Sequence, residues 1–154
     1  MTISFDIDST LVPQGNEFPT EPRTLWTGLL GAEPLRVGTV KLFGDLRRKG
    51  HLIYIYTTSY RSRLTLLRTF LAHGIRPEKY IAGDLNRKTL ARNNCNSSKN
   101  PKLFDIDLHV DDLPGVGIEG KQHHFETVIV DPKDKQWEAR VLSAVKDLEL
   151  RKMN

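Results

Sequence analysis

The sequence of 154 residues predicts an α/β fold, a three-layer sandwich whose central, mainly parallel β-sheet is covered by helices. Two observations carry this prediction. Short apolar segments alternate along the chain with amphipathic segments of helical period, which is the pattern of strands joined by crossover helices. One of the apolar segments, residues 51–56, is nearly continuous, and a strand that is buried on both faces has this composition.

Length and composition indicate a single domain, residues 1–154. Hydrophobic residues make up 38% of the chain and charged residues 27%, as in globular rather than disordered proteins. The net charge is +4, and we interpret the basic clusters as solvated helix faces in preference to a nucleic-acid footprint. No apolar run has the length of a membrane span and the N-terminus has no signal-peptide pattern, so we expect no membrane partner and a cytoplasmic location. The single Cys95 excludes an internal disulfide.

The chain begins with an apolar, strand-like segment that runs directly into Asp6 and Asp8. A segment rich in proline and glycine follows over residues 12–38. Prolines at this density exclude a long helix, although residues 24–30 have room for a short one. Long connections of this kind are usually functional, and we expect a loop or partial lid here.

Two amphipathic helices flank the strand predicted over residues 51–56. The first, over residues 39–49, ends at Gly50, and the second covers residues 61–73. We expect their apolar faces to be formed by Val40, Phe43 and Leu46 in the first helix and by Leu64, Leu67, Phe70 and Leu71 in the second. Ser59 is the expected N-cap of the second helix.

The second half of the chain contains three further short apolar segments. Residues 84–102 are polar and basic, and their Asn and Ser residues predict a loop over most of this stretch. Residues 113–115 predict a turn. The remaining expected strands are residues 79–83, 106–110 and 125–130, and the expected closing helix is residues 136–150.

Three of the predicted strands end in residues that can carry chemistry. Asp6 and Asp8 follow the first strand, the hydroxyl residues 57–59 follow the second, and Asp111 and Asp112 follow a third. If the sheet is parallel, these ends meet at one edge, where open α/β sheets bind ligands. Paired carboxylates repel each other unless a cation, a proton or a donor compensates, and Mg²⁺ prefers oxygen ligands. The sequence therefore predicts a metal-dependent active site at this edge.

This ordered set resembles the motifs of the haloacid dehalogenase (HAD) superfamily of phosphatases and phosphotransferases. The family's first motif, DxDx(T/V), corresponds to residues 6–10. Its second, an apolar strand ending in Thr or Ser, corresponds to residues 52–57, and its fourth, an apolar strand ending in paired acids, to residues 108–112. The resemblance covers residues 3 to about 130 and implies a HAD-like Rossmannoid fold and phosphoryl-transfer chemistry.

The resemblance also implies roles for individual residues. Asp6 would be the nucleophile that forms an aspartyl-phosphate, and Asp8 the general acid and base. Mg²⁺ would be held by the Asp6 carboxylate, the Asp8 backbone carbonyl and an acid from the pair Asp111 and Asp112, with the member of that pair that contacts the metal left open. The presence of Asp8 favours phosphoryl chemistry over dehalogenation, because the family's dehalogenases lack this second acid.

The family's phosphate-binding hydroxyl and lysine have several candidates here. Thr57 is the expected hydroxyl donor, with Thr58 as the alternative if the strand ends one residue later. For the lysine that compensates phosphoryl charge we prefer Lys99, in the segment just ahead of the fourth motif, over Lys88 and Lys102. His109, His123 and His124 have no partners at metal-ligand spacing and are left outside the site, as surface or core residues.

The intervals between the motifs leave no room for a large cap domain, so by resemblance this is a capless (C0) member. Such relatives have open sites and take large substrates or close the site by forming homo-oligomers. The expected activity is a Mg²⁺-dependent phosphatase acting on a phosphorylated substrate, either a small molecule or a macromolecule. The alternatives are a nucleic-acid end phosphatase and a non-catalytic phosphate- or Mg²⁺-binding regulatory protein with the same fold.

Overall fold

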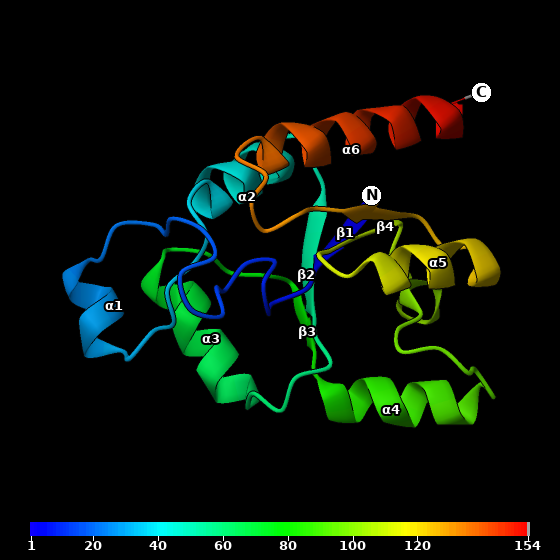
Figure 1. The fold of residues 1–154 in the computed structure, drawn as a ribbon, viewed down its shortest axis with the longest axis horizontal. Coiled ribbons are helices and arrows are strands. Elements are labelled where there is room, and N and C mark those ends of the chain that lie inside the picture. The colour runs from blue at the N-terminus through cyan, green and yellow to red at the C-terminus, as the bar shows by residue number, and fades with distance from the viewer. Residues whose placement is uncertain (154) are drawn as a thin grey trace.

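The computed structural model describes residues 1–153, and their centre is a five-stranded sheet with all strands parallel (Figure 1). The strand order is β3-β2-β1-β4-β5, so the N-terminal strand lies in the middle. The strands are β1 (Thr2–Phe5), β2 (Leu52–Tyr56), β3 (Lys79–Ile81), β4 (Leu108–Asp111) and β5 (Thr127–Ile129). The predicted α/β class and parallel sheet are thereby confirmed.

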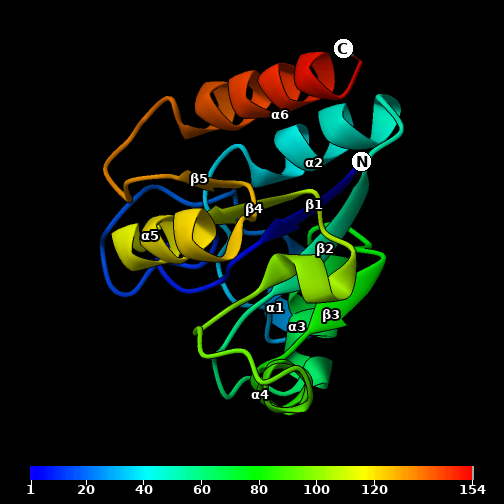
Figure 2. The ribbon, with the colours of Figure 1, turned by 90° about the vertical axis from the view of Figure 1, so that its right-hand side faces the viewer.

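Helices cover both faces of the sheet. They are α1 (Leu25–Leu29), α2 (Thr39–Arg48), α3 (Arg63–Ala72), α4 (Gly83–Arg92), the 3₁₀ helix η1 (Pro101–Phe104), α5 (Pro114–His123) and α6 (Trp137–Met153). Figure 2 shows α2 and α6 side by side on one side of the sheet and α5 on the other. Within residues 1–153, no helix combines the length and the apolar composition that crossing a membrane requires.

Strand side chains alternate between two different environments. Ile3, Phe5 and Ile55 belong to the main apolar core, which they share with residues of α2, α3 and α6. The Phe5 and Phe43 rings lie 4.6 Å apart in this core. The alternate residues project to the opposite face, and several of them are polar although fully buried: Ser4, Tyr56, His109 and Asp111. The second face therefore carries the buried polar groups from which the site is built.

Two predictions in the second half of the chain were wrong, because helices replace a loop and a turn. The stretch predicted as a loop contains α4, whose buried positions Gly83, Asn86 and Leu90 follow helical spacing. Its polar composition hid this pattern, since one of the three buried residues is itself an amide. The predicted turn is the start of α5, where Pro114 occupies the first helical position.

Glycines in α5 hid its helical character and allow its close packing. A Cβ atom on Gly120 would lie 2.9 Å from the carbonyl oxygen of Phe125, and one on Gly117 would lie 3.2 Å from the Ile129 side chain. The helix therefore lies directly against β5 because these positions have no side chain.

The helix faces were also predicted incorrectly in part. In α3, Leu66 and Phe70 are buried, whereas the expected core residues Leu64, Leu67 and Leu71 are 51%, 39% and 37% exposed. In α2, Phe43 and Leu46 are buried as expected, but Val40 is exposed. The N-cap of α3 is Ser62, whose hydroxyl accepts a hydrogen bond from the Thr65 N–H at 3.1 Å, and not Ser59. When leucines lie on several sides of a helix, the helical period alone does not show which side faces the core.

The connection between β1 and α2, residues 12–38, is anchored near its end by Arg36. This side chain is 1% exposed, and its Nη2 donates to the carbonyl oxygens of Asp131, Pro132 and Asp134 at 2.8–3.0 Å. Its guanidinium also lies over the Trp137 ring, 4.9 Å from the centroid. Thr20 pairs with Arg36 in an isolated antiparallel bridge, so the intervening residues loop outward from a closed base. The short helix α1 within this loop confirms the one expected over residues 24–30.

We predict that Arg36→Met lowers the free energy of unfolding by about 2–4 kcal/mol, because three backbone carbonyls lose the charged donor that the buried Arg36 side chain supplies. Urea denaturation checks this. Arg140→Met is the matched control, because Arg140 is 57% exposed and contacts only the surface carboxylate of Asp134 among the ion pairs of residues 1–153, so its removal leaves stability nearly unchanged. Equal losses in both variants would contradict the anchoring role of Arg36.

Candidate active site

The three clusters at strand ends lie at one edge of the sheet. Strands β1, β2 and β4 are adjacent and parallel, and in their register Phe5 is paired with both Ile55 and Val110. The chain therefore leaves these strands at the same level. The ladder continues one residue further on β1, where the Asp6 N–H donates to the Val110 carbonyl oxygen at 2.9 Å.

Lys99 joins the first and third clusters. Its Nζ donates to Asp6 Oδ1 and to Asp111 Oδ2, both at 2.6 Å, and all three side chains are less than 10% exposed. Lys88 and Lys102, the other lysine candidates, are exposed. Of the three candidate lysines, Lys99 is thus the one that reaches the acids, and its contact with both Asp6 and Asp111 was not predicted.

The electrostatics of this group follow from burial and charge. Burial and the nearby Asp111 charge raise the pKa of Asp6 to about 7, against the opposing effect of Lys99. Burial alone would lower the pKa of Lys99, but the two carboxylates outweigh it and hold that pKa above its ordinary value. Burial also opposes ionisation of Asp111, yet its bonds to His109 and Lys99 keep its pKa well below the usual range. Asp111 and Lys99 are therefore charged at neutral pH, and Asp6 is poised between its two forms.

The loop that carries Lys99 is held by residues that the sequence analysis missed. The Tyr56 hydroxyl accepts a hydrogen bond from the Asn100 N–H at 3.0 Å and donates to Asn86 Oδ1 at 2.5 Å. Asn86 in turn donates to the Ser98 carbonyl at 2.8 Å, and Glu119 accepts from the Ser98 N–H at 2.8 Å. Helices α4 and α5 thus position Lys99 through this network.

Three carboxylates form the candidate metal centre. One oxygen atom each of Asp6, Asp111 and Asp112 lie within 4.8 Å of one another. Thr10 orients Asp112 through a 3.1 Å hydrogen bond from its hydroxyl, while burial and the Asp111 charge raise the pKa of Asp112. With all three carboxylates ionised, the Lys99 charge leaves two negative charges uncompensated, and the donors are hard oxygens. This donor set fits a divalent cation such as Mg²⁺.

Asp8 lies outside this carboxylate cluster. Its side chain is 29% exposed and accepts a hydrogen bond from Arg61 Nη1 at 2.5 Å. Arg61 also donates to both oxygens of Glu33, at 2.8 and 2.9 Å, so it joins Asp8 to the connection between β1 and α2. Burial alone would lower the pKa of Arg61. Its bonds to Glu33 and Asp8 outweigh this effect and hold the pKa above its ordinary value, so Arg61 stays charged. Arg61 and Glu33 were not predicted as site residues, because Arg61 belongs to a basic cluster, residues 61–68, that we interpreted as a solvated helix face, and Glu33 lies in the connection expected to be a loop.

Thr57 is buried at the end of β2, and Thr58 is exposed. The Thr57 hydroxyl accepts from the Ser59 N–H and donates to the Ser59 hydroxyl, both at 3.1 Å. Ser59 therefore shapes the turn after β2 instead of capping the next helix.

His109 was left outside the site, yet it contacts Asp111. Its Nε2 lies 3.0 Å from Asp111 Oδ2, and its Nδ1 lies 2.8 Å from the Ser4 hydroxyl. Burial lowers the pKa of His109, so the ring is neutral at physiological pH. This contact could have been predicted from strand alternation, because His109 and Asp111 are two residues apart in β4 and therefore share a face.

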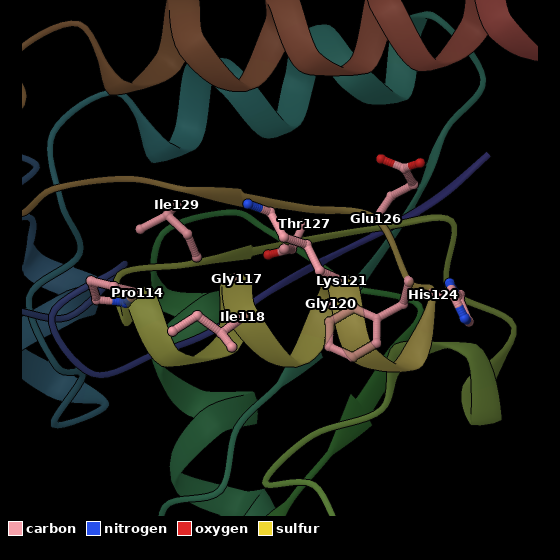
Figure 3. Close-up of a pocket in the computed structure, with 10 residues that line it drawn as sticks. Pro114, Gly117, Ile118, Gly120, Lys121, His124, Glu126, Thr127 and Ile129 are labelled. Atoms are coloured by element: carbon pink, nitrogen blue, oxygen red, sulfur yellow. The ribbon is translucent and has the colours of Figure 1, made fainter.

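An open groove of about 660 Å³ runs along α5 and the edge strand β5, away from the carboxylates (Figure 3). Gly117, Gly120, Thr127 and Ile129 form part of its lining, and Pro114 is its nearest residue in sequence to Asp112. The groove is lined by none of the acidic side chains of the candidate site.

Comparison of the chain with protein-family models gives no match, and comparison with curated proteins gives none either. The chemical interpretation of the site therefore depends on its residues alone.

The raised pKa of Asp6 predicts how the metal-free protein responds to pH. Between about pH 4 and 7 the folded state holds a proton on Asp6 that the unfolded chain has lost, so the free energy of unfolding falls as pH rises through this window. Asp6→Asn cannot titrate and should lack this fall, which amounts to at most about 1.4 kcal/mol per pH unit. Urea denaturation at several pH values in EDTA measures it. Asp105→Asn, at an exposed carboxylate, should keep the wild-type slope. An unchanged slope in Asp6→Asn would contradict the assignment.

Proposed function

We propose that the protein is a HAD-like phosphoric monoester hydrolase, a Mg²⁺-dependent phosphatase that works through an aspartyl-phosphate on Asp6. The observation that carries this proposal is the buried Asp6–Lys99–Asp111 group with Asp112 beside it, at the carboxyl edge of a parallel sheet. Phosphoryl transfer needs an oxygen nucleophile, charge compensation and a proton donor, and this edge offers all three.

In the proposed mechanism, Asp6 attacks phosphorus with the carboxylate oxygen that Lys99 does not occupy. The P–O bond to the leaving group breaks as the new bond forms, and Asp8 gives the leaving oxygen its proton. Asp8 then takes a proton from water, whose oxygen attacks phosphorus, releases phosphate and restores the Asp6 carboxylate. A bound Mg²⁺, held by Asp6, Asp111 or Asp112 and the Asp8 carbonyl, supplies compensation for phosphoryl charge.

Two further groups have parts in this mechanism. Thr57 donates its hydroxyl to a phosphoryl oxygen in place of its bond to Ser59. Arg61 orients Asp8, whose partial exposure leaves the carboxylate accessible to a leaving group. Both Asp8 and Arg61 lie where the β1–α2 connection meets the segment after β2, so this connection borders the substrate.

One observation favours the nucleic-acid end phosphatase as the second candidate. Tyr60, three residues after Thr57, is 94% exposed, and the Arg87 guanidinium lies 5.6 Å from its ring centroid. An exposed ring supported by a cation is a surface on which bases stack. The non-catalytic alternative, a phosphate- or Mg²⁺-binding regulatory protein, differs from both enzymes in that it hydrolyses no phosphomonoester.

We predict that the wild-type protein releases phosphate from a generic aryl phosphate only with Mg²⁺, and that Asp6→Asn lowers kcat by about 10³-fold or more, because the nucleophile is lost. Steady-state assays with and without EDTA measure both effects. Asp105→Asn is the control and should retain wild-type turnover. Full activity in Asp6→Asn would exclude the covalent mechanism, and a folded wild type without activity on a broad panel would favour the binding protein.

For the second candidate, Tyr60→Ala should raise KM for a phosphorylated oligonucleotide by about tenfold, the loss of one stacked base, and leave KM for glycerol phosphate unchanged. Comparing 3′- and 5′-phosphorylated oligonucleotides identifies the preferred end. Equal KM values for Tyr60→Ala and the wild type on every oligonucleotide would remove nucleic acid as the favoured substrate.

A further inference from the structure

A buried polar chain extends from the candidate metal centre into the protein. Asp111 Oδ2 contacts His109 Nε2 at 3.0 Å, and His109 Nδ1 contacts the Ser4 hydroxyl at 2.8 Å. All three residues are 0% exposed, and the Tyr56 ring lies beside the imidazole with its centroid 5.2 Å away. Burial of three polar side chains on one sheet face is costly unless each finds a partner, so the chain is a specific feature of this site.

The partners fix the position of the protons. An ionised carboxylate only accepts hydrogen bonds, so the His109 nitrogen that faces Asp111, Nε2, carries the hydrogen. In the neutral ring Nδ1 is then an acceptor, and the Ser4 hydroxyl donates to it. Asp111 thus selects the tautomer: His109 Nε2 donates to Asp111, and Nδ1 accepts from Ser4.

The two carboxylate oxygens of Asp111 receive different numbers of hydrogen bonds. Oδ2 receives two hydrogen bonds, from Lys99 Nζ at 2.6 Å and from His109 Nε2 at 3.0 Å, which occupy both of its lone-pair directions. From residues 1–153, Oδ1 receives one hydrogen bond, from the Leu113 N–H at 2.9 Å, and keeps a second lone pair. The two oxygens of the same carboxylate are therefore unequal.

We propose that His109 is a positioning residue that fixes the Asp111 carboxylate so that Oδ1 alone is offered to a divalent cation. The inference rests on the cation site that the proposed function needs. Lys99 cannot fix this orientation alone, because its ammonium group is shared with Asp6. His109, two residues away on the same strand, bonds to Oδ2 and leaves Oδ1 with the Leu113 N–H as its partner among the described residues. Partners that orient a metal ligand in this way commonly change metal affinity by about 10- to 100-fold.

Two amide substitutions test the proposal. The side-chain nitrogen of Gln can replace imidazole Nε2, whereas that of Asn corresponds to Nδ1, so His109→Gln keeps a donor to Asp111 and His109→Asn does not. Titration of metal-free protein with Mg²⁺ by calorimetry should give a Kd for His109→Gln within about threefold of wild type and a Kd for His109→Asn about 10- to 100-fold weaker. Equal affinity in the three proteins, or equal loss in both variants, would overturn the proposal. Thermal unfolding in EDTA reports whether each variant is folded.

A measurement on the unaltered protein keeps the proposal testable if His109→Asn does not fold. Nitrogen-15 NMR of the wild type should show His109 as the neutral tautomer with hydrogen on Nε2, and hydrogen on Nδ1 instead would overturn the proposal. Hydrolysis assays on the same samples separate this inference from the proposed function. Mg²⁺ binding with the expected pattern but no hydrolysis contradicts the function alone, whereas hydrolysis without that pattern contradicts the role of His109 alone.

Discussion

The structure depends on one ammonium group, that of Lys99, between two buried carboxylates. Asp6 and Asp111 lie at the ends of neighbouring strands. Because both carboxylates are buried, water screens their charges little and they repel each other strongly. The lysine makes their approach tolerable, but it carries one charge against two and leaves Asp6 incompletely compensated. That remaining imbalance is the physical basis of the cation site that we propose here.

The position of Lys99 is in turn a product of the whole fold. Its loop is held by a tyrosine from β2, an amide from α4 and a glutamate from α5, so both helices that were not predicted contribute to it. The face of the sheet opposite the main apolar core supplies Tyr56, His109 and Ser4 as a second, polar interior. On this face the hydrogen-bonded groups lie beside a small apolar cluster of Tyr56, Ile81, Phe104 and Ile106.

The sheet, most of its elements and the meeting of the acidic residues at one edge could be predicted from the sequence. A strand and the residues that follow it can be recognised from a few consecutive positions. Helices α4 and α5 could not be recognised, since Asn86 occupies a core position and glycines replace apolar residues against β5. The contact of Arg61 with Asp8 joins distant segments, and Arg61 differs from its basic neighbours only in what it faces. The contact of His109 with Asp111 is local to β4, but its second partner, Ser4, reaches it only because β1 and β4 are side by side.

The closed base of the β1–α2 connection allows the residues inside it to vary independently of the sheet. The bridge between Thr20 and Arg36 and the contact between Glu33 and Arg61 isolate the intervening residues, including α1 with its exposed Leu25 and Trp26, from the sheet. Length and composition can vary inside this bounded segment without disturbing the strand ends. It is a natural point at which evolution, or an engineer, can insert a recognition module and alter which molecules reach the acids while the scaffold stays the same.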